Sequence, residues 1–157
     1  MKSYYHTKSD QICYLAWAVW HNLGNGFSRE IYADALEREF IEAGVPYRRN
    51  QNIPVYYKDI LLPHSFTADF LVHDKIILRV AGQTEITETQ WREVASMLGA
   101  SRLNLGIYIN YADKKPEFKR IVYETKFLNS KNSGREDQTD RPQDEKSIDS
   151  FISEVAV

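Results

Sequence analysis

The most constraining feature of this sequence is the order in which helix-type and strand-type patterns follow one another. Two helical patterns come first. Ser9-Asp10 precede an apolar-periodic run that extends to residue 20, and Ser28 precedes a second run that ends at Gly44. Ser and Asp are favoured helix N-caps, and glycine readily adopts the left-handed conformation that ends helices. We therefore expect a pair of helices to open the domain.

Strand-type patterns follow this helix pair. Short β-branched and aromatic runs bounded by turn residues indicate strands, whereas apolar residues at helical spacing indicate helices. These patterns predict strands over residues 53–58, 65–72, 76–81 and 103–110, a helix over 87–98 and a closing helix over 118–127. The expected order is α-α-β-β-β-α-β-α, which defines an α/β domain.

The composition changes sharply after residue 128. Residues 129–147 contain no aromatic or aliphatic side chain, so they cannot offset the entropy cost of ordering the chain. Beyond them Ile148, Phe151, Ile152 and Val155 recur at the spacing of one helix face. We expect a domain over 1–128, a polar flexible linker over 129–147 and a short amphipathic segment over 148–157. The segment either docks on its own domain or binds another molecule, and the sequence leaves both open.

Length, charge and cysteine content exclude several classes of protein. With 157 residues the chain is about one domain, large enough to fold without a disulfide or metal. A net charge of −2 is unlike a non-specific nucleic-acid binder, which carries a strong positive excess. The lone Cys13 excludes an internal disulfide. No signal peptide and no apolar stretch of about 20 residues is present, so we expect a cytoplasmic protein with no membrane contact.

Several motifs stand in a fixed order across residues 9–127. LGNGF occupies residues 23–27, ADFLV occupies 68–72 and LGIYIN occupies 105–110. With these motifs at these spacings, the chain resembles the bacterial GxxExxY proteins, which are similar to PD-(D/E)XK nucleases. The resemblance implies a PD-(D/E)XK nuclease-like (restriction-endonuclease-like) core, in which helices flank a central mixed sheet.

The same resemblance implies where a nuclease site would lie. Phosphodiester hydrolysis uses a divalent cation that prefers carboxylate oxygens and activates water. In the family the ligands are a helical Glu, an Asp that ends a strand and the Glu of a Glu-x-Lys on the next strand. The corresponding positions here are Arg29, Asp69, Arg79 and Ala81. Two arginines and one aspartate carry a net charge of +1, which disfavours Mg²⁺. We therefore expect a degenerate site with no metal and no cofactor.

Arg79 stands in the middle of an apolar strand and must be paired or reach solvent, because a buried lone charge is very costly. Asp69 on the neighbouring strand is the expected partner. One interpretation is a structural salt bridge that fills the vacated site. The other is an anion-binding or nucleic-acid-binding surface, since aromatic and basic residues alternate around Tyr47 and Tyr57. The candidate anion-binding residues are Arg29, Arg79, Arg48, Arg49 and Lys58.

Three hypotheses of function follow from these residues. The first is a catalytically inactive nuclease-like domain, which acts as a protein-interaction or assembly module with a protein partner or as a homo-oligomer. The second is a non-cleaving protein that binds nucleic acid or a phosphate ligand. The third is an active Mg²⁺-dependent nuclease with a migrated site, which would combine Asp69 with Glu30, Glu85 or Glu88. A second carboxylate within metal reach of Asp69 would favour the third hypothesis.

Overall fold

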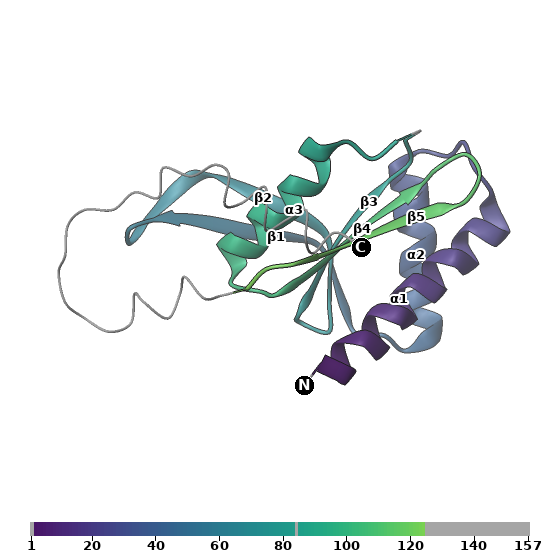
Figure 1. Ribbon diagram of the computed structural model, residues 1–157, viewed down its shortest axis with the longest axis horizontal. Coiled ribbons are helices and arrows are strands. Elements are labelled where there is room, and N and C mark those ends of the chain that lie inside the picture. The colour runs from purple at the N-terminus through teal and green to yellow at the C-terminus, as the bar shows by residue number, and fades with distance from the viewer. Residues whose placement is uncertain (1, 84, 125–157) are drawn as a thin grey trace.

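The computed structural model describes residues 2–83 and 85–124, which form a five-stranded sheet with three helices (Figure 1). The elements in chain order are α1 (Lys2–Leu23), α2 (Arg29–Ala43), β1 (Tyr47–Tyr57), β2 (Ile60–Val72), β3 (Ile76–Ala81), α3 (Glu88–Ser101), β4 (Leu105–Tyr111) and β5 (Pro116–Val122). Within these ranges no helix has both the length and the apolar character needed to span a bilayer. The expected linker and amphipathic segment lie outside the described residues.

The sheet is mixed, as the sequence predicts. The strands lie in the order β1-β2-β3-β4-β5, and only β3 and β4 run parallel to each other. Helix α3 connects these two strands, as a parallel pair requires a crossover. Buried side chains of α1 and α2 pack on one face of the sheet, and those of α3 pack on the other. The result is a three-layer α/β domain.

Helix ends follow the local signals closely, with one exception. Ser28 is the N-cap of α2, and Gly44 ends that helix in the left-handed conformation with φ of 67°. Thr87 and Gln90 form a capping box at the start of α3. Helix α1, however, begins at Lys2, so the expected start at Ser9-Asp10 is wrong. The helix continues through both residues, so their N-cap preference does not set where it begins.

The expected closing helix is also wrong. Residues 116–122 form strand β5, which pairs antiparallel with β4 in a register that includes Ile109↔Phe118 and Ile107↔Arg120. Without β5 the fully buried strand β4 would carry a row of unpaired backbone groups, which is costly. Hydrogen bonding across the sheet therefore overrides the local helix signal. The rest of the predicted helix, residues 125–127, lies outside the described residues.

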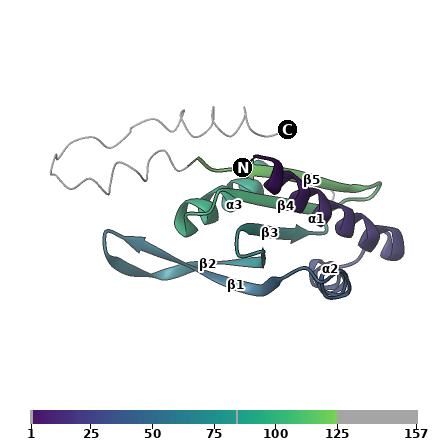
Figure 2. The ribbon, with the colours of Figure 1, turned by 90° about the horizontal axis from the view of Figure 1, so that it is seen from below.

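Strands β1 and β2 are longer than expected and form a projecting hairpin. Their pairing extends from Tyr47↔Val72 to Tyr57↔Ile60, whereas β2 pairs with β3 only from Phe70↔Leu78 to Val72↔Ile76. Before Phe70, β2 is therefore paired with β1 alone. Figures 1 and 2 show this two-stranded ribbon extending away from α1 and α2. The hairpin turns at Lys58, whose φ is 50°.

Candidate functional site

Asp69 lies where the hairpin leaves the sheet. It immediately precedes Phe70, the first residue of β2 that pairs with β3, so the two strands diverge at its position. Although charged, Asp69 is only 3% exposed. A buried carboxylate needs hydrogen-bond partners, because desolvation of an unpaired charge is very costly. The partners of Asp69 therefore decide what this site can do.

Both oxygens of the Asp69 carboxylate accept hydrogen bonds. Oδ1 accepts one from Nη2 of Arg29 at 3.0 Å, and Oδ2 accepts one from the backbone N–H of Val80 at 2.7 Å. Nη1 of Arg79 lies 4.0 Å from Oδ1, at the outer limit of an ion pair. A cation at this carboxylate would therefore lie beside the Arg29 guanidinium and compete with it for Oδ1.

Arg29 reaches Asp69 because α2 begins close to the end of β3. Arg29 is the first residue of α2, and Gly82 directly follows β3. A Cβ at Gly82 would lie 2.9 Å from the carbonyl oxygen of Phe27 and 3.2 Å from the ring of Tyr32. Only glycine therefore permits this close approach of the two backbones. The contact holds the start of α2, and with it Arg29, beside β3.

Arg79 contacts more than its expected partner. Its Nη1 donates a hydrogen bond to the carbonyl oxygen of Thr67 at 2.8 Å, and its Nη2 lies 3.5 Å from Oε1 of Glu93. Asp69 is thus the more distant of its contacts, and the nearer partner of Asp69 is Arg29. With Glu93 included, the site holds two guanidinium groups and two carboxylates, so its charges balance instead of summing to +1.

The role of Glu93 and Tyr108 was missed by sequence reasoning. Glu93 follows Trp91 and precedes Val94, two α3 residues buried against the sheet, so its position at the edge of that buried face was a usable signal. Tyr108 lies opposite Arg79 in the parallel β3–β4 register and is 4% exposed. Burial raises the pKa of Tyr108. That Tyr108 lies opposite Arg79 follows only from the pairing of β3 with β4.

The fourth position implied by the family resemblance, Ala81, is apolar. Ala81, where the resemblance expects a lysine, is 5% exposed and belongs to the buried cluster between the sheet and α3. Just beyond it, the buried side chain of Asn110 accepts a hydrogen bond from the Gln83 N–H at 2.9 Å and donates one to the Gln83 carbonyl at 3.0 Å. These bonds hold the segment after β3 in place.

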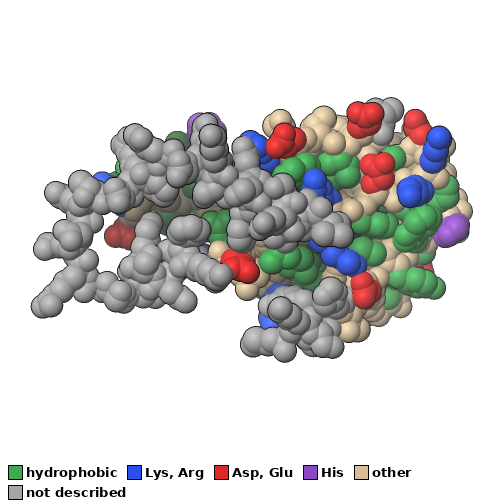
Figure 3. Space-filling model, viewed as in Figure 1, with side chains coloured by type: hydrophobic (Ala, Val, Ile, Leu, Met, Phe, Trp, Pro, Cys, Tyr) green, Lys and Arg blue, Asp and Glu red, His purple; other side chains and the backbone are tan. Residues whose placement is uncertain are grey.

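The remaining candidate cations have other partners. Arg48 pairs with Asp74 at 3.1 Å. Arg49 pairs with Glu37 at 2.6 Å and Asp34 at 3.0 Å. Lys58 stands at the hairpin turn, with Nζ 5.6 Å from the centroid of the Tyr57 ring. On the face drawn in Figure 3, outside the grey atoms, acidic and basic side chains are interspersed. Of the five candidates, only Arg29 and Arg79 share a carboxylate.

Two of the three carboxylates of the migrated-site hypothesis, Glu30 and Glu88, contact residues other than Asp69. Glu30 is fully exposed, and hydrogen bonds from its own backbone N–H and from Ser28 lower its pKa. Glu88 pairs with Arg92 at 2.7 Å. Among residues 7–83 and 85–124, whose side chains the structure describes, no three His, Cys, Asp or Glu side chains are placed to hold a metal ion together.

Comparison with known proteins identifies a family whose model matches most of the chain. A family model described as the PD-(D/E)XK nuclease superfamily matches residues 6–121. A solved structure, the alkaline exonuclease from Laribacter hongkongensis, is 14% identical in sequence and superposes with a TM-score of 0.40; the match covers 90% of this chain and 77% of that one. No curated protein matches. The narrower resemblance to GxxExxY proteins stays a prediction.

Proposed function

This chain belongs to the PD-(D/E)XK nuclease superfamily, and we propose that it is a non-catalytic member that serves as a protein-interaction or assembly module. Its mixed sheet flanked by helices is the α/β architecture of that superfamily. The observation that carries the proposal is the state of Asp69. Both of its oxygens are occupied by protein donors, and one donor is a guanidinium group.

Catalysis by a hard cation requires several oxygen ligands at short distance from one another. Here the positions that would supply two of them are Arg29 and Arg79, and the position of the catalytic lysine is the buried Ala81. Two carboxylates that would ligate a cation are therefore replaced by guanidinium groups, which cannot act as metal ligands. Although Glu93 balances the net charge of the site, this loss of oxygen ligands supports a loss of metal-dependent cleavage.

The interaction role is supported by the end of the β1–β2 hairpin. Five large apolar side chains near the turn are exposed, by between 37% and 67% of their surface: Tyr56, Tyr57, Ile60, Leu61 and Leu62. We call these residues the hairpin tip. Because side chains alternate along a strand, Tyr56 and Leu61 lie on one face of the ribbon and Tyr57, Ile60 and Leu62 on the other. Exposed apolar side chains gathered at one tip favour a surface that binds another protein. The hairpin tip is the surface that we expect a protein partner to cover.

The second hypothesis, phosphate or nucleic-acid binding, has one observation in its favour. The Arg29 side chain is 45% exposed, so part of its guanidinium faces solvent. Against it, Arg29 and Arg79 are balanced by Asp69 and Glu93, and an anion would compete with both carboxylates. This balance is why the protein-interaction role is preferred.

The test has two arms. In the first, purified chain is incubated with DNA and RNA in the presence of Mg²⁺ or Mn²⁺, and no cleavage is expected. Metal-dependent cleavage that Asp69→Ala abolishes would contradict the proposal. A salt titration of binding distinguishes the second hypothesis, because phosphate contacts weaken steeply as salt rises. Salt-sensitive binding lost in the Arg29→Glu, Arg79→Glu double variant would favour that hypothesis instead.

In the second arm, proteins from the native host are captured with wild-type chain and with the Ile60→Glu, Leu61→Glu double variant. The variant should lose the partner, because charges on the hairpin tip cannot be desolvated there without large cost. Tyr14→Glu is the matched control, since Tyr14 is 73% exposed on α1, away from the hairpin. Equal capture by wild type and double variant would rule out the hairpin tip as the interface.

A further inference from the structure

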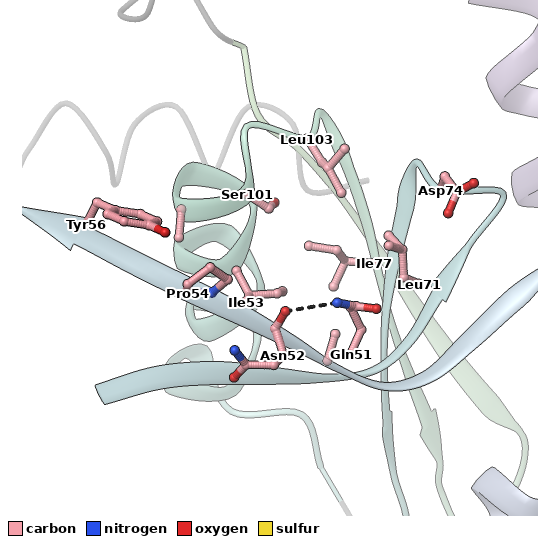
Figure 4. Close-up of a pocket in the computed structure, with 12 residues that line it drawn as sticks. Gln51, Asn52, Ile53, Pro54, Tyr56, Leu71, Asp74, Ile77, Ser101 and Leu103 are labelled. Atoms are coloured by element: carbon pink, nitrogen blue, oxygen red, sulfur yellow. Dashed lines mark hydrogen bonds between the residues drawn. The ribbon is translucent and has the colours of Figure 1, made fainter. Parts of the chain in front are cut away.

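A groove runs between the β1–β2 hairpin and the C-terminal end of α3. Its volume is about 350 Å³, and Figure 4 shows side chains of both walls directed into it. The apolar lining comes from Ile53, Ala68, Leu71 and Ile77 of the sheet and from Ala100 and Leu103 on the α3 side. Tyr56 extends the groove toward the hairpin tip. This site is distinct from Asp69 and its arginines.

The size of the groove limits what can fill it. A stable interface with a separate protein buries roughly 800 Å² on each partner. A cavity of about 350 Å³ is at the lower end of the range for small ligands and holds a few side chains. Its lining is predominantly apolar, so it suits a few aliphatic or aromatic side chains held close by a tether. A short segment of the same chain meets both requirements.

The described chain leaves the domain beside this groove. The backbone N–H of Tyr123, just after β5, donates a hydrogen bond to the carbonyl oxygen of Asn104 at 2.8 Å. The Tyr123 ring lies next to Gly99, because a Cβ at that glycine would be 3.4 Å from the tyrosine hydroxyl oxygen. The groove residue Ser101 is two residues after Gly99, and the groove residue Leu103 directly precedes Asn104. The following residues therefore start at the α3 wall of the groove.

The sequence that follows carries a matching apolar stripe. Ile148, Phe151, Ile152 and Val155 share one face at helical spacing, and 23 residues, 125–147, precede them. A flexible tether of this length has a root-mean-square span of roughly 25 Å. That distance exceeds the radius of gyration of a domain of this size, roughly 14 Å. Tethering at such a length also raises the local concentration of the stripe to the millimolar range.

We propose that residues 148–157 bind in this groove within the same molecule, with the apolar stripe against Ile53, Leu71 and Leu103. The proposal does not depend on whether the Asp69 site is catalytic. It adds an intramolecular binding site to the domain. Docking of the stripe would also cover part of Tyr56, which belongs to the hairpin tip, whereas Tyr57 and Ile60 do not line the groove.

Disulfide formation in the full-length chain tests this. In a Cys13→Ser background, Ser101→Cys places a thiol in the groove wall and Ala156→Cys places one beside Val155. The matched control replaces Ser101→Cys with Ser96→Cys, an exposed position on the same helix. Both serine-to-cysteine changes are small, so the fold is retained. The groove pair should oxidise to an intramolecular disulfide at least about ten times faster than the control pair, at a rate independent of protein concentration.

A further substitution, Phe151→Ser, is added to the groove pair to test the apolar stripe. It should lower the rate to that of the control, because the largest apolar side chain of the stripe is removed. Equal rates for the groove and control pairs would overturn the proposal. Disulfides formed only between two molecules would also overturn it, since the stripe would then bind in trans. An unchanged rate in the Phe151→Ser chain would show that the stripe is not what docks.

Discussion

The two ends of strand β2 differ in which side chains they bury and which they expose. At the sheet end, the charged Asp69 is 3% exposed and both of its oxygens accept hydrogen bonds. At the hairpin end, the apolar Ile60 is 67% exposed. Folded proteins usually bury the apolar side chain and expose the charged one. The difference teaches that the buried charge is part of the framework, whereas the uncovered apolar surface is available for contact.

The reason for this difference lies in how β2 is paired. From Phe70 to Val72 it has β1 on one side and β3 on the other, with helices over the sheet. Near the turn it has only β1 as a neighbour. The same strand therefore passes from a three-layer interior to a two-stranded ribbon. Asp69 lies at the junction, where the divergence of β2 and β3 makes room for the Arg29 and Arg79 guanidinium groups.

The largest effect is expected from Asp69→Ala. The substitution leaves the buried N–H of Val80 without its acceptor and leaves two guanidinium groups without their shared carboxylate. The unfolding free energy, measured by urea denaturation, should fall by about 3–5 kcal/mol. Asp113→Ala, at an exposed position, should change it by less than about 0.5 kcal/mol. If Asp69→Ala instead stabilises the domain, the native Asp69 lowers its stability. The interpretation of this buried charge as part of the structural framework is then wrong.

A comparison inside the hairpin sharpens the contrast for apolar residues. Ile53, which is 4% exposed, packs against the α3 side of the sheet, whereas Ile60 belongs to the hairpin tip. Ile53→Ala should lower the unfolding free energy by about 2–4 kcal/mol through lost burial and a residual cavity. Ile60→Ala should change it by less than about 0.5 kcal/mol. A comparable loss in both variants would mean that the isolated chain already covers the hairpin tip.

Of the two arginines, the more buried Arg79 should contribute more to the unfolding free energy than Arg29. The Arg79 side chain is 18% exposed and contacts Thr67 and Glu93 as well as Asp69, whereas the Arg29 side chain is 45% exposed. Arg79→Ala should lower the unfolding free energy by about 1–2 kcal/mol. Arg29→Ala should cost less than about 1 kcal/mol, because solvent screens its ion pair. A larger cost for Arg29→Ala would make the shorter contact to Asp69 the dominant one.

The smallest expected effect concerns Tyr108 at alkaline pH. Burial raises the pKa of Tyr108 in the folded state above the ordinary tyrosine value of about 10. The unfolded chain then loses the proton first, so the unfolding free energy decreases as pH rises above about 10. In Tyr108→Phe this contribution is absent, and the decrease between about pH 9 and pH 11 should be smaller than in wild type. Urea unfolding at these pH values measures both slopes, and identical slopes would refute the prediction.

Local patterns predicted most elements well but failed where pairing across the sheet decides. The capping residues Ser28 and Thr87 and the left-handed Gly44 mark true helix ends, because a cap depends on backbone groups within one turn. Residues 118–122 were predicted as part of a helix because no local signal reports that β4 needs a neighbour. The length of the hairpin was underestimated for the same reason.

The same distinction between local patterns and long-range contacts applies to the candidate site. From the sequence, Asp69 was identified as its centre and Arg29, Arg79 and Ala81 as the altered positions. The sequence did not reveal that Arg29, 40 residues away, is the nearer partner, or that Glu93 balances the second arginine. These contacts depend on how closely α2 and α3 approach the sheet, which Gly82 and Gly106 permit by lacking a Cβ.

The sequence by itself determined the α/β class, the nuclease superfamily and the helix ends at Ser28, Gly44 and Thr87, and it suggested the four positions of the candidate site. These follow from short-range backbone hydrogen bonding and from residue types at fixed spacings. Only the tertiary structure decided which guanidinium contacts Asp69, that the last described element is a strand, and that the hairpin tip stands uncovered. Those outcomes depend on hydrogen bonds and packing between segments far apart in the chain, whose approach is set by the fold as a whole.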